Sequence, residues 1–192
     1  MSLPRILDAT AGNRTIWRTK RDPRILFIDI EPELEFKPDM LLDCTKTGFP
    51  DGHFHTIIFD PPHIFGQRPG KALYACRNRA ERMAWVGRNS MPAYYGGDKF
   101  RTRRDLIRFV YQASKELYRI LADDGVLFLK WNDAEIPLEV ILAYLKWNWR
   151  EMIRLNIGDP THTLAETNTF WMLFMKKRAR YPRQIEFNGP TP

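Results

Sequence analysis

The chain has 192 residues, of which 44% are hydrophobic and 13% aromatic, so it is long and apolar enough for one globular domain with a sizeable core. No apolar run approaches the roughly 20 residues that a membrane-spanning helix needs, and two cysteines, Cys44 and Cys76, provide neither a disulfide framework nor a metal site. We therefore expect a cytoplasmic protein without a signal peptide, a membrane partner or a metal.

The positive charge is concentrated in one segment, residues 68–104. The chain as a whole has a net charge of +7, but this segment holds ten basic and two acidic residues and leaves the remainder at −1. Tyrosines such as Tyr94 and Tyr95 are interleaved with its arginines. Arginine binds phosphates and aromatic rings stack on bases, so the segment predicts contact with DNA or RNA. The alternative is an ordinary solvated face.

Three short apolar runs near the N-terminus predict buried parallel strands. The first starts at Arg5 and breaks at Gly12, the second covers residues 25–30, and the third covers residues 39–44. Residues 31–38, between the second and third runs, are too few for a full crossover helix. We expect the helix at this place to be short or absent.

A fourth apolar run, residues 55–59, ends in Asp60-Pro61-Pro62-His63. Proline fixes φ and has no N–H, so the turn presents carbonyl oxygens and one carboxylate in a stiff frame. Ligands bind at this edge of open α/β sheets. The turn can accept both hydrogens of an exocyclic NH2 group of adenine or cytosine, and His63 offers a flat face to a flipped base.

The rest of the chain predicts a closing set of helices and strands. An amphipathic helix over residues 102–121 is capped by Thr102 and stopped by residues 123–125. Then follow a strand over 125–131, a helix over 137–149, and strands over 151–158 and 167–177, the last two joined by a loop with His162. Lys130 falls on the same sheet edge as Asp60. Residues 1–178 form the predicted domain, with 68–104 as a substrate insert, and residues 179–192 a polar tail.

Two of these motifs resemble those of a known family. Asp60-Pro61-Pro62-His63 resembles the Asp/Asn-Pro-Pro-aromatic signature of S-adenosylmethionine-dependent amino-methyltransferases, with His63 where Tyr, Phe or Trp is usual. The stretch from Asp8 to Gly12 resembles their first cofactor motif, and Arg14 occupies the place of its second glycine. The resemblance implies a single α/β Rossmann-like methyltransferase domain. Its sheet would be mostly parallel and seven-stranded, with a terminal antiparallel strand and with helices on both faces, shortened near the N-terminus.

The resemblance also implies roles for individual residues. The amine would be held by Asp60 and Pro61, beside Pro62 and His63. S-adenosyl-L-methionine would be bound by one set of residues: Asp8, Ala9, Thr10, Gly12, Asp29, Ile30, Asp43 and Cys44. Within this set Asp29 would bind the ribose and Asp43 the cofactor's exocyclic amine. The substrate would be contacted by a second set: Arg77, Arg79, Arg82, Tyr94, Tyr95, Lys130 and His162.

Alternatives remain at three of these positions. Glu31 competes with Asp29 for the ribose, Asp43 could instead cap the end of its strand, and Gly12 could belong to an ordinary turn. Asparagine at position 60 would favour glutamine or guanine by analogy, whereas Asp60 favours adenine or cytosine.

The sequence therefore predicts an S-adenosylmethionine-dependent N-methyltransferase with adenine N6 of DNA or RNA as the leading substrate. Little chain is left for a recognition domain, so target choice would come from residues 68–104, from a partner subunit, or not at all. Two other interpretations are a methyltransferase for a small molecule or protein side chain, and a non-catalytic nucleic-acid-binding module with the same fold.

Overall fold

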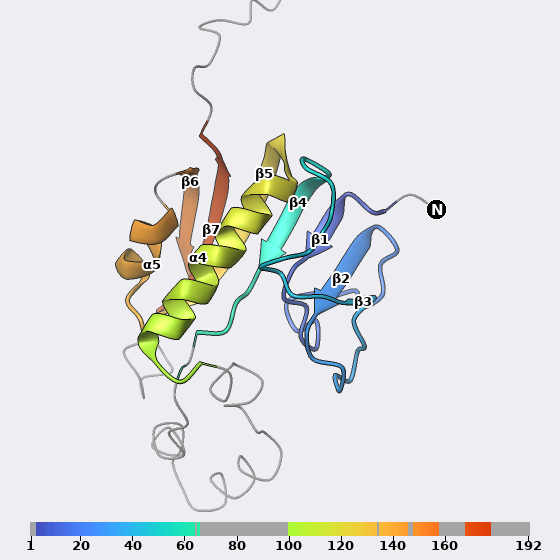
Figure 1. Cartoon of the computed structure of the whole chain (residues 1–192), viewed down its shortest axis with the longest axis horizontal. Helices are drawn as coiled ribbons and strands as arrows, with labels where there is room; N and C mark the ends of the chain where they lie inside the picture. The colour runs from blue at the N-terminus through green and yellow to red at the C-terminus, as the bar shows by residue number, and fades with distance from the viewer. Residues whose placement is uncertain are drawn as a thin grey trace, which may run out of the picture.

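Figure 1 shows a computed structural model of the chain, which describes residues 3–63, 65, 100–133, 135–145, 148–157 and 168–177. In chain order its elements are β1 (Ile6–Asp8), β2 (Ile25–Asp29), β3 (Met40–Leu41), β4 (Phe54–Phe59), α4 (Arg103–Ile120), β5 (Leu121–Asn132), α5 (Leu138–Leu145), β6 (Trp149–Asn156) and β7 (Thr169–Lys176).

The strands form one seven-stranded sheet in the order β3-β2-β1-β4-β5-β7-β6. Neighbouring strands are parallel from β3 to β5, whereas β7 is antiparallel to both β5 and β6. From β1 the chain adds β2 and β3 on one side of the sheet, and then crosses to add β4 and β5 on the other side of β1. The strand order therefore reverses between β1 and β4, and open α/β sheets bind ligands at such a point. The predicted fold class is confirmed: a mostly parallel sheet with a terminal antiparallel strand.

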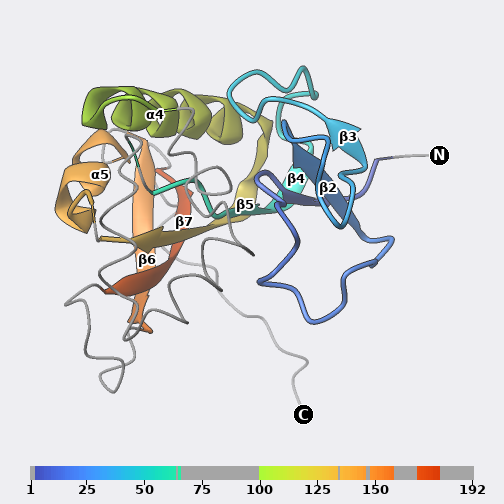
Figure 2. The same ribbon diagram turned by 90° about the horizontal axis from the view of Figure 1, so that it is seen from below.

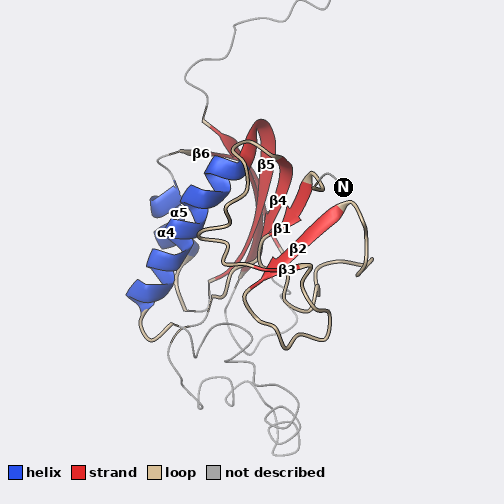
Figure 3. Cartoon of the chain, turned by 45° about the vertical axis from the view of Figure 1, so that its right-hand side comes forward, coloured by secondary structure: helices blue, strands red, loops and turns tan. Residues whose placement is uncertain are grey.

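Both described helices lie on the same face of the sheet (Figures 2 and 3). The apolar stripe of α4, including Leu106, Val110 and Leu117, is fully buried there. The opposite face of β1 and β2 is covered by a loop, residues 9–24, whose Trp17 ring packs edge-on against Phe27 at 5.8 Å between centroids. In the described residues, helices therefore cover one face and a loop takes the place of a helix on the other.

The amphipathic helix begins where the sequence predicts. Thr102 is the N-cap of α4: its Oγ1 accepts a hydrogen bond from the backbone N–H of Asp105, and the Asp105 side chain accepts one from the backbone N–H of Thr102. This reciprocal arrangement satisfies two N–H groups that the first turn leaves without helical partners.

The end of α4 differs from the prediction. The helix ends at Ile120 and β5 begins at the next residue, Leu121, rather than at 125. Residues 122–125 form a bulge, because the pairing of β4 with β5 moves from Phe54↔Leu121 to Thr56↔Val126. Glycine is favoured at position 125, since a Cβ would lie 2.8 Å from the Leu121 side chain and 3.0 Å from the His55 carbonyl oxygen.

Other predicted elements also have different bounds. β3 has only two residues, whereas the prediction covered 39–44, and no helix forms among residues 30–39, as expected. The predicted helix over 137–149 is shorter, and its last residue, Trp149, instead begins β6. Trp149 is buried between Tyr118 and Phe174, with centroids at 5.3 and 6.5 Å, and this packing outweighs the local helical pattern.

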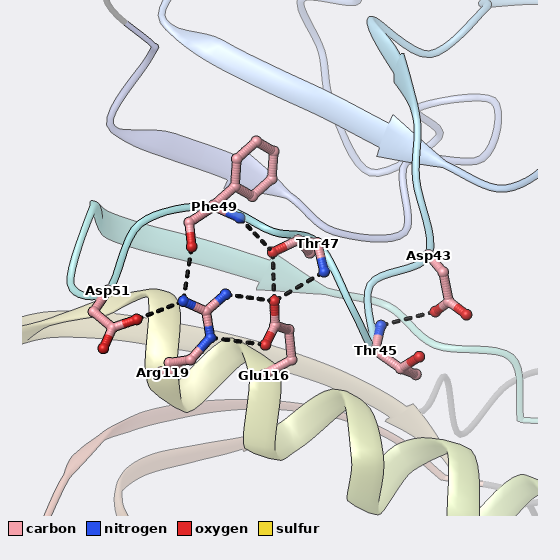
Figure 4. Close-up of polar contacts among 7 residues, drawn as sticks. All are labelled: Asp43, Thr45, Thr47, Phe49, Asp51, Glu116 and Arg119. Carbon is pink, nitrogen blue, oxygen red and sulfur yellow. Dashed lines mark hydrogen bonds and ion pairs between the residues drawn. The ribbon is translucent and has the colours of Figure 1, made fainter.

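A polar network fixes the loop between β3 and β4 against α4 (Figure 4). Glu116 Oε1 accepts hydrogen bonds from the backbone N–H and the hydroxyl of Thr47, at 2.8 and 2.6 Å. Arg119 donates to both Glu116 carboxylate oxygens, at 2.9 and 2.7 Å, and to the carbonyl of Phe49 at 2.7 Å. It also pairs with Asp51. The loop is thus held by charge-assisted bonds where a crossover helix would pack through apolar contacts.

We expect Glu116→Ala to lower the free energy of unfolding by about 2 kcal/mol at pH 7, because it removes hydrogen bonds to a charged group. Urea unfolding measures this, with the exposed neighbour Lys115→Ala as the matched control.

Hydrogen bonds from Arg119 and Thr47 lower the pKa of Glu116 from 4.5 to about 2. A lowered pKa stabilises the fold above pH 4.5, and this stabilisation is lost as the pH falls towards 2. An equal effect of the substitution at pH 7 and pH 2 would contradict this account.

Candidate active site

Three acidic residues meet at the carboxyl ends of neighbouring parallel strands. β1 ends at Asp8, β2 ends at Asp29, and Asp60 directly follows β4. The charges of Asp60 and Asp29 both contribute to the raised pKa of Asp8, so Asp8 lies within electrostatic reach of each of the other two carboxyl groups. The site therefore straddles the point where the strand order reverses.

The loop after β1 is bonded to the strands on both sides. The backbone N–H of Ala9 donates to the carbonyl of Ile58 in β4 at 2.9 Å, and that of Ala11 donates to the carbonyl of Ile28 in β2 at 3.0 Å. The Asp60 backbone N–H also donates to Thr10 Oγ1 at 2.9 Å. The predicted cofactor loop and the predicted catalytic turn are thus one connected unit.

Gly12 lies in this loop with its backbone against open space. Its φ is +48°, which favours glycine, and no atom lies within 4 Å of the position that a Cβ would occupy. Its N–H donates to Asp29 Oδ2 at 2.9 Å. A ligand can therefore approach the backbone closely here.

Arg14, in the place of a second glycine, also has a positive φ, of 54°. Its side chain is buried, with the guanidinium carbon 3.9 Å from the centroid of the Phe27 ring and Nη2 donating to the Lys37 carbonyl at 2.7 Å. Lys37 and the nearby Asp39 precede β3, so they belong to the amino-terminal end of the sheet. The long side chain thus turns away from Gly12 and leaves the space beside it open.

Asp8 is fully buried rather than lining an open surface. Its Oδ2 accepts a 2.6 Å hydrogen bond from Trp17 Nε1, and its Oδ1 accepts one from the Thr10 N–H at 3.2 Å. Burial raises the pKa of Asp8 from 3.8 to about 7, against the lowering effect of these two bonds. In this structure Asp8 holds the loop in place, and its contact with a cofactor stays a prediction.

Asp29 and Ile30 lie together at the carboxyl end of β2. Asp29 Oδ1 accepts a hydrogen bond from the Glu31 N–H at 2.9 Å, as Oδ2 does from Gly12, so each oxygen keeps acceptor capacity for a ligand hydroxyl. Ile30, the next residue, is 51% exposed at the end of β2. A carboxylate with free acceptor sites beside an exposed apolar side chain suits a ribose with its base.

Asp43 and Cys44 lie beyond the short β3. Asp43 is exposed and accepts a hydrogen bond from the Thr45 N–H at 2.8 Å, which is the geometry of a residue that caps the loop (Figure 4). Cys44 is 4% exposed in the core, and burial raises the pKa of its thiol. Its side chain is therefore inert packing, and only its backbone is available to a ligand.

Asp60 forms an ion pair with Lys130 in the adjacent strand β5. Lys130 Nζ lies 2.8 Å from Asp60 Oδ2, and the two side chains are 23% and 15% exposed. Burial raises the pKa of Asp60, while the charge and hydrogen bond of Lys130 oppose the rise. The sequence placed Lys130 at this edge but did not reveal the pair, which depends on the register between β4 and β5.

His63 is a neutral ring beside this pair. Burial and the charge of Lys130 lower its pKa to about 4, although a hydrogen bond to the Pro61 backbone opposes the shift. The ring lies edge-on to Trp131, with centroids 6.5 Å apart. At neutral pH His63 therefore presents an uncharged imidazole to a ligand.

Most of the predicted substrate contacts lie outside the described residues: Arg77, Arg79, Arg82, Tyr94, Tyr95 and His162. The same holds for nearly all of the basic segment. Its last residues, Arg103 and Arg104, are exposed at the start of α4. Among the predicted substrate residues, the structure brings Lys130 to the site.

Other candidate sites are few in the described part of the chain. A hollow of about 780 Å³ lies at the amino-terminal end of the sheet, with Pro4, Pro23 and Asp39 in its lining. It is at the opposite end from Asp60, whereas ligands of such sheets bind at the carboxyl ends. Within the described ranges, no group of three or more His, Cys, Asp or Glu side chains could hold a metal ion, and no described helix is long and apolar enough to cross a membrane.

No protein-family model matches the sequence, and no curated protein matches it. Among solved structures, the PH0226 protein from Pyrococcus horikoshii OT3 is similar, with a TM-score of 0.52 and 11% identity over 90% of this chain and 81% of that one. PH0851 has a TM-score of 0.52 and 12% identity over 90% of this chain and 43% of that one.

A third solved structure is N-methyltransferase NodS from Bradyrhizobium japonicum WM9 in complex with S-adenosyl-L-homocysteine. It has a TM-score of 0.45 and 10% identity over 90% of this chain and 76% of that one. At these identities the first two likenesses show the fold alone, and the TM-score of NodS is too low to support an inference.

Proposed function

We propose that this chain is an S-adenosylmethionine-dependent N-methyltransferase that acts on an exocyclic amine, with adenine N6 of DNA or RNA as the leading substrate. The observation that carries the proposal is the bonding of the Asp60-Pro61 turn to the β1 loop through Thr10. This bond connects the turn that would bind the amine to the loop that contains Gly12. The same loop is bonded to Asp29, the acid at the end of β2.

The residues present fit the cofactor. Gly12 offers backbone with open space beside it, and Asp29 keeps acceptor capacity on both carboxylate oxygens. Ile30 supplies an exposed apolar face next to Asp29. We assign the methionine moiety to the Gly12 loop, the ribose to Asp29 and the adenine to Ile30. When bound, S-adenosylmethionine supplies an electrophilic methyl group on a sulfonium.

The chain's own residues orient the amine and remove its proton. An exocyclic amine is a poor nucleophile because its lone pair is delocalised into the ring. The Asp60 carboxylate and the Pro61 carbonyl accept its two hydrogens and hold the lone pair towards the methyl group, so that catalysis is mainly by positioning. The nitrogen would gain the methyl group as the sulfur–methyl bond breaks and leaves S-adenosylhomocysteine, and Asp60 would take the proton that the nitrogen loses and pass it to water. The raised pKa of Asp60 favours this transfer.

The charge distribution supports a nucleic-acid substrate. Residues 68–104 carry a net charge of +8 and follow the proposed catalytic turn directly in the sequence. The arginines and aromatic side chains of this segment would bind the phosphates and neighbouring bases of a strand from which one base is flipped. Choice of target sequence would come from this segment or from a partner subunit.

The test is calorimetry with S-adenosylmethionine and S-adenosylhomocysteine. We expect binding in the micromolar range that Asp29→Ala weakens at least about tenfold, because a hydrogen-bonded carboxylate is lost. Asp124→Ala is the matched control, since Asp124 is exposed in the bulge of β5 and should leave binding unchanged. If the unaltered protein binds neither compound, the enzyme proposal is wrong and the basic segment becomes the functional feature.

A further inference from the structure

We propose that Lys130 and Asp60 act as a two-point reader of one chemical pattern, an NH2 group and an acceptor nitrogen bonded to the same ring carbon. Adenine N6 with N1 and cytosine N4 with N3 have this pattern on their Watson–Crick edges, whereas guanine N2 has it only with N3, on the opposite side of its amine. The inference rests on the proposed function and deepens it, because it names the edge of the substrate that the site selects and makes Lys130 a specificity-determining residue.

The geometry of the pair matches that edge. Asp60 Oδ2 accepts and Lys130 Nζ donates, and the two atoms lie 2.8 Å apart. Two nitrogens on one ring carbon are about 2.3 Å apart, given C–N bonds of about 1.33 Å. The amine can therefore donate to Asp60 while the ring nitrogen accepts from Lys130, in two nearly parallel hydrogen bonds.

Both members of the pair have capacity for a second partner. The Lys130 ammonium has three N–H bonds, of which the bond to Asp60 uses one, and a carboxylate oxygen accepts more than one hydrogen bond. With the side chains 23% and 15% exposed, the pair is sheltered but reachable. Charge-assisted hydrogen bonds in such surroundings are stronger than those between neutral groups.

The same ammonium disfavours other amines. An aliphatic amine such as a lysine side chain is itself protonated at neutral pH and has no neighbouring acceptor, so Lys130 repels it. Guanine presents an N–H donor beside its amine on the Watson–Crick edge, which opposes the Lys130 donor. For a base presented by its Watson–Crick edge, the described part of the site thus favours adenine or cytosine over guanine, and it disfavours the side chain of lysine.

The test compares single-atom analogues of the base. Random-sequence single-stranded oligonucleotides would contain adenine, 1-deazaadenine or 7-deazaadenine, and methyl transfer from S-adenosylmethionine would be measured as kcat/KM. A second series would use cytosine and 3-deazacytosine. We expect loss of the acceptor at N1 or N3 to lower kcat/KM about 10- to 100-fold, the range for a hydrogen bond to a charged group, and the 7-deaza change to have little effect.

The variant Lys130→Met tests whether this preference comes from Lys130. It should remove the preference for adenine over 1-deazaadenine even if the overall rate falls, because a merely structural role would change both rates alike. Lys176→Met is the matched control, since Lys176 pairs with exposed Asp123 at the other end of β7 and should keep the preference.

The outcomes separate the inference from the proposed function. Equal transfer to adenine and 1-deazaadenine by the unaltered protein, or an undiminished preference in Lys130→Met, overturns the inference and leaves the methyltransferase standing. Transfer to a lysine-containing peptide at a rate similar to that for an oligonucleotide also overturns it. If no base is methylated while the cofactor binds, the proposed substrate class fails, and the inference fails with it.

Discussion

Asp60→Ala is expected to lower the rate of methyl transfer about 10²- to 10⁴-fold, the usual contribution of a residue that orients a reacting group and takes its proton. The carboxylate follows β4 directly, is 15% exposed and is paired with Lys130. Affinity for S-adenosylmethionine should change less than about threefold, since the proposed cofactor contacts at Gly12 and Asp29 are untouched.

Single-turnover methyl transfer and calorimetry on the same preparation would measure the two effects. Asp60→Asn is the informative second variant, because it keeps one acceptor oxygen but removes the proton acceptor and the charge that pairs with Lys130. Its rate should lie between those of the unaltered protein and Asp60→Ala. Activity retained in Asp60→Ala would remove Asp60 from the mechanism.

Asp8→Asn is expected to change how stability depends on pH. Burial raises the pKa of Asp8 from 3.8 to about 7 in the folded protein. For a group with a raised pKa, stability is fully present below the unfolded value of about 3.8 and is lost as the pH rises through about 7. Between pH 5 and pH 8 the unaltered protein should therefore lose about 2 to 3 kcal/mol more than the variant does.

Urea unfolding at the two pH values gives this difference directly. Asparagine has a single acceptor oxygen, so one donor among Trp17 Nε1 and the Thr10 N–H loses its partner, at a cost of about 1 kcal/mol that does not depend on pH. The free energy of unfolding of the variant, relative to that of the unaltered protein, should consequently increase as the pH rises. Parallel pH dependences in the two proteins would show that Asp8 does not titrate as a buried acid.

Much of the fold could be predicted because local patterns and packing agree. In α4, the apolar stripe and the Thr102 cap predict a helix, and the packing of the stripe also requires one. The apolar runs of β1, β2 and β4 fit a strand and do not have the spacing of a helix. The prediction of a helix at Trp149 was wrong because the residues before it suit a helix. The Trp149 ring is buried against Phe174, which is distant in the sequence. The predicted start of β5 was wrong because the pairing with β4 determines it. That pairing includes a bulge in which β5 has three more residues than β4.

The placement of the candidate residues was predictable where they follow the end of a strand. Asp29, Gly12 and Asp60 occupy the positions expected from their places after apolar runs. The burial of Asp8 depends on Trp17, and the pairing of Asp60 with Lys130 depends on strand register. Arg14 conflicted with the cofactor motif because a long side chain stands where the motif has its second glycine. The sequence alone does not show in which direction that side chain points. The structure resolves the conflict by turning the side chain towards Phe27 and Lys37.

The two halves of the sheet differ in strand length, and this divides the domain energetically. β5 has twelve residues and pairs along most of its length with β4 and β7, whereas β1, β2 and β3 have three, five and two. Opening the short half breaks fewer contacts, so its local unfolding costs less free energy. The proposed ligand contacts at Gly12 and Asp29 lie in that half, so ligand binding would raise the free energy of local unfolding there more than in the long half.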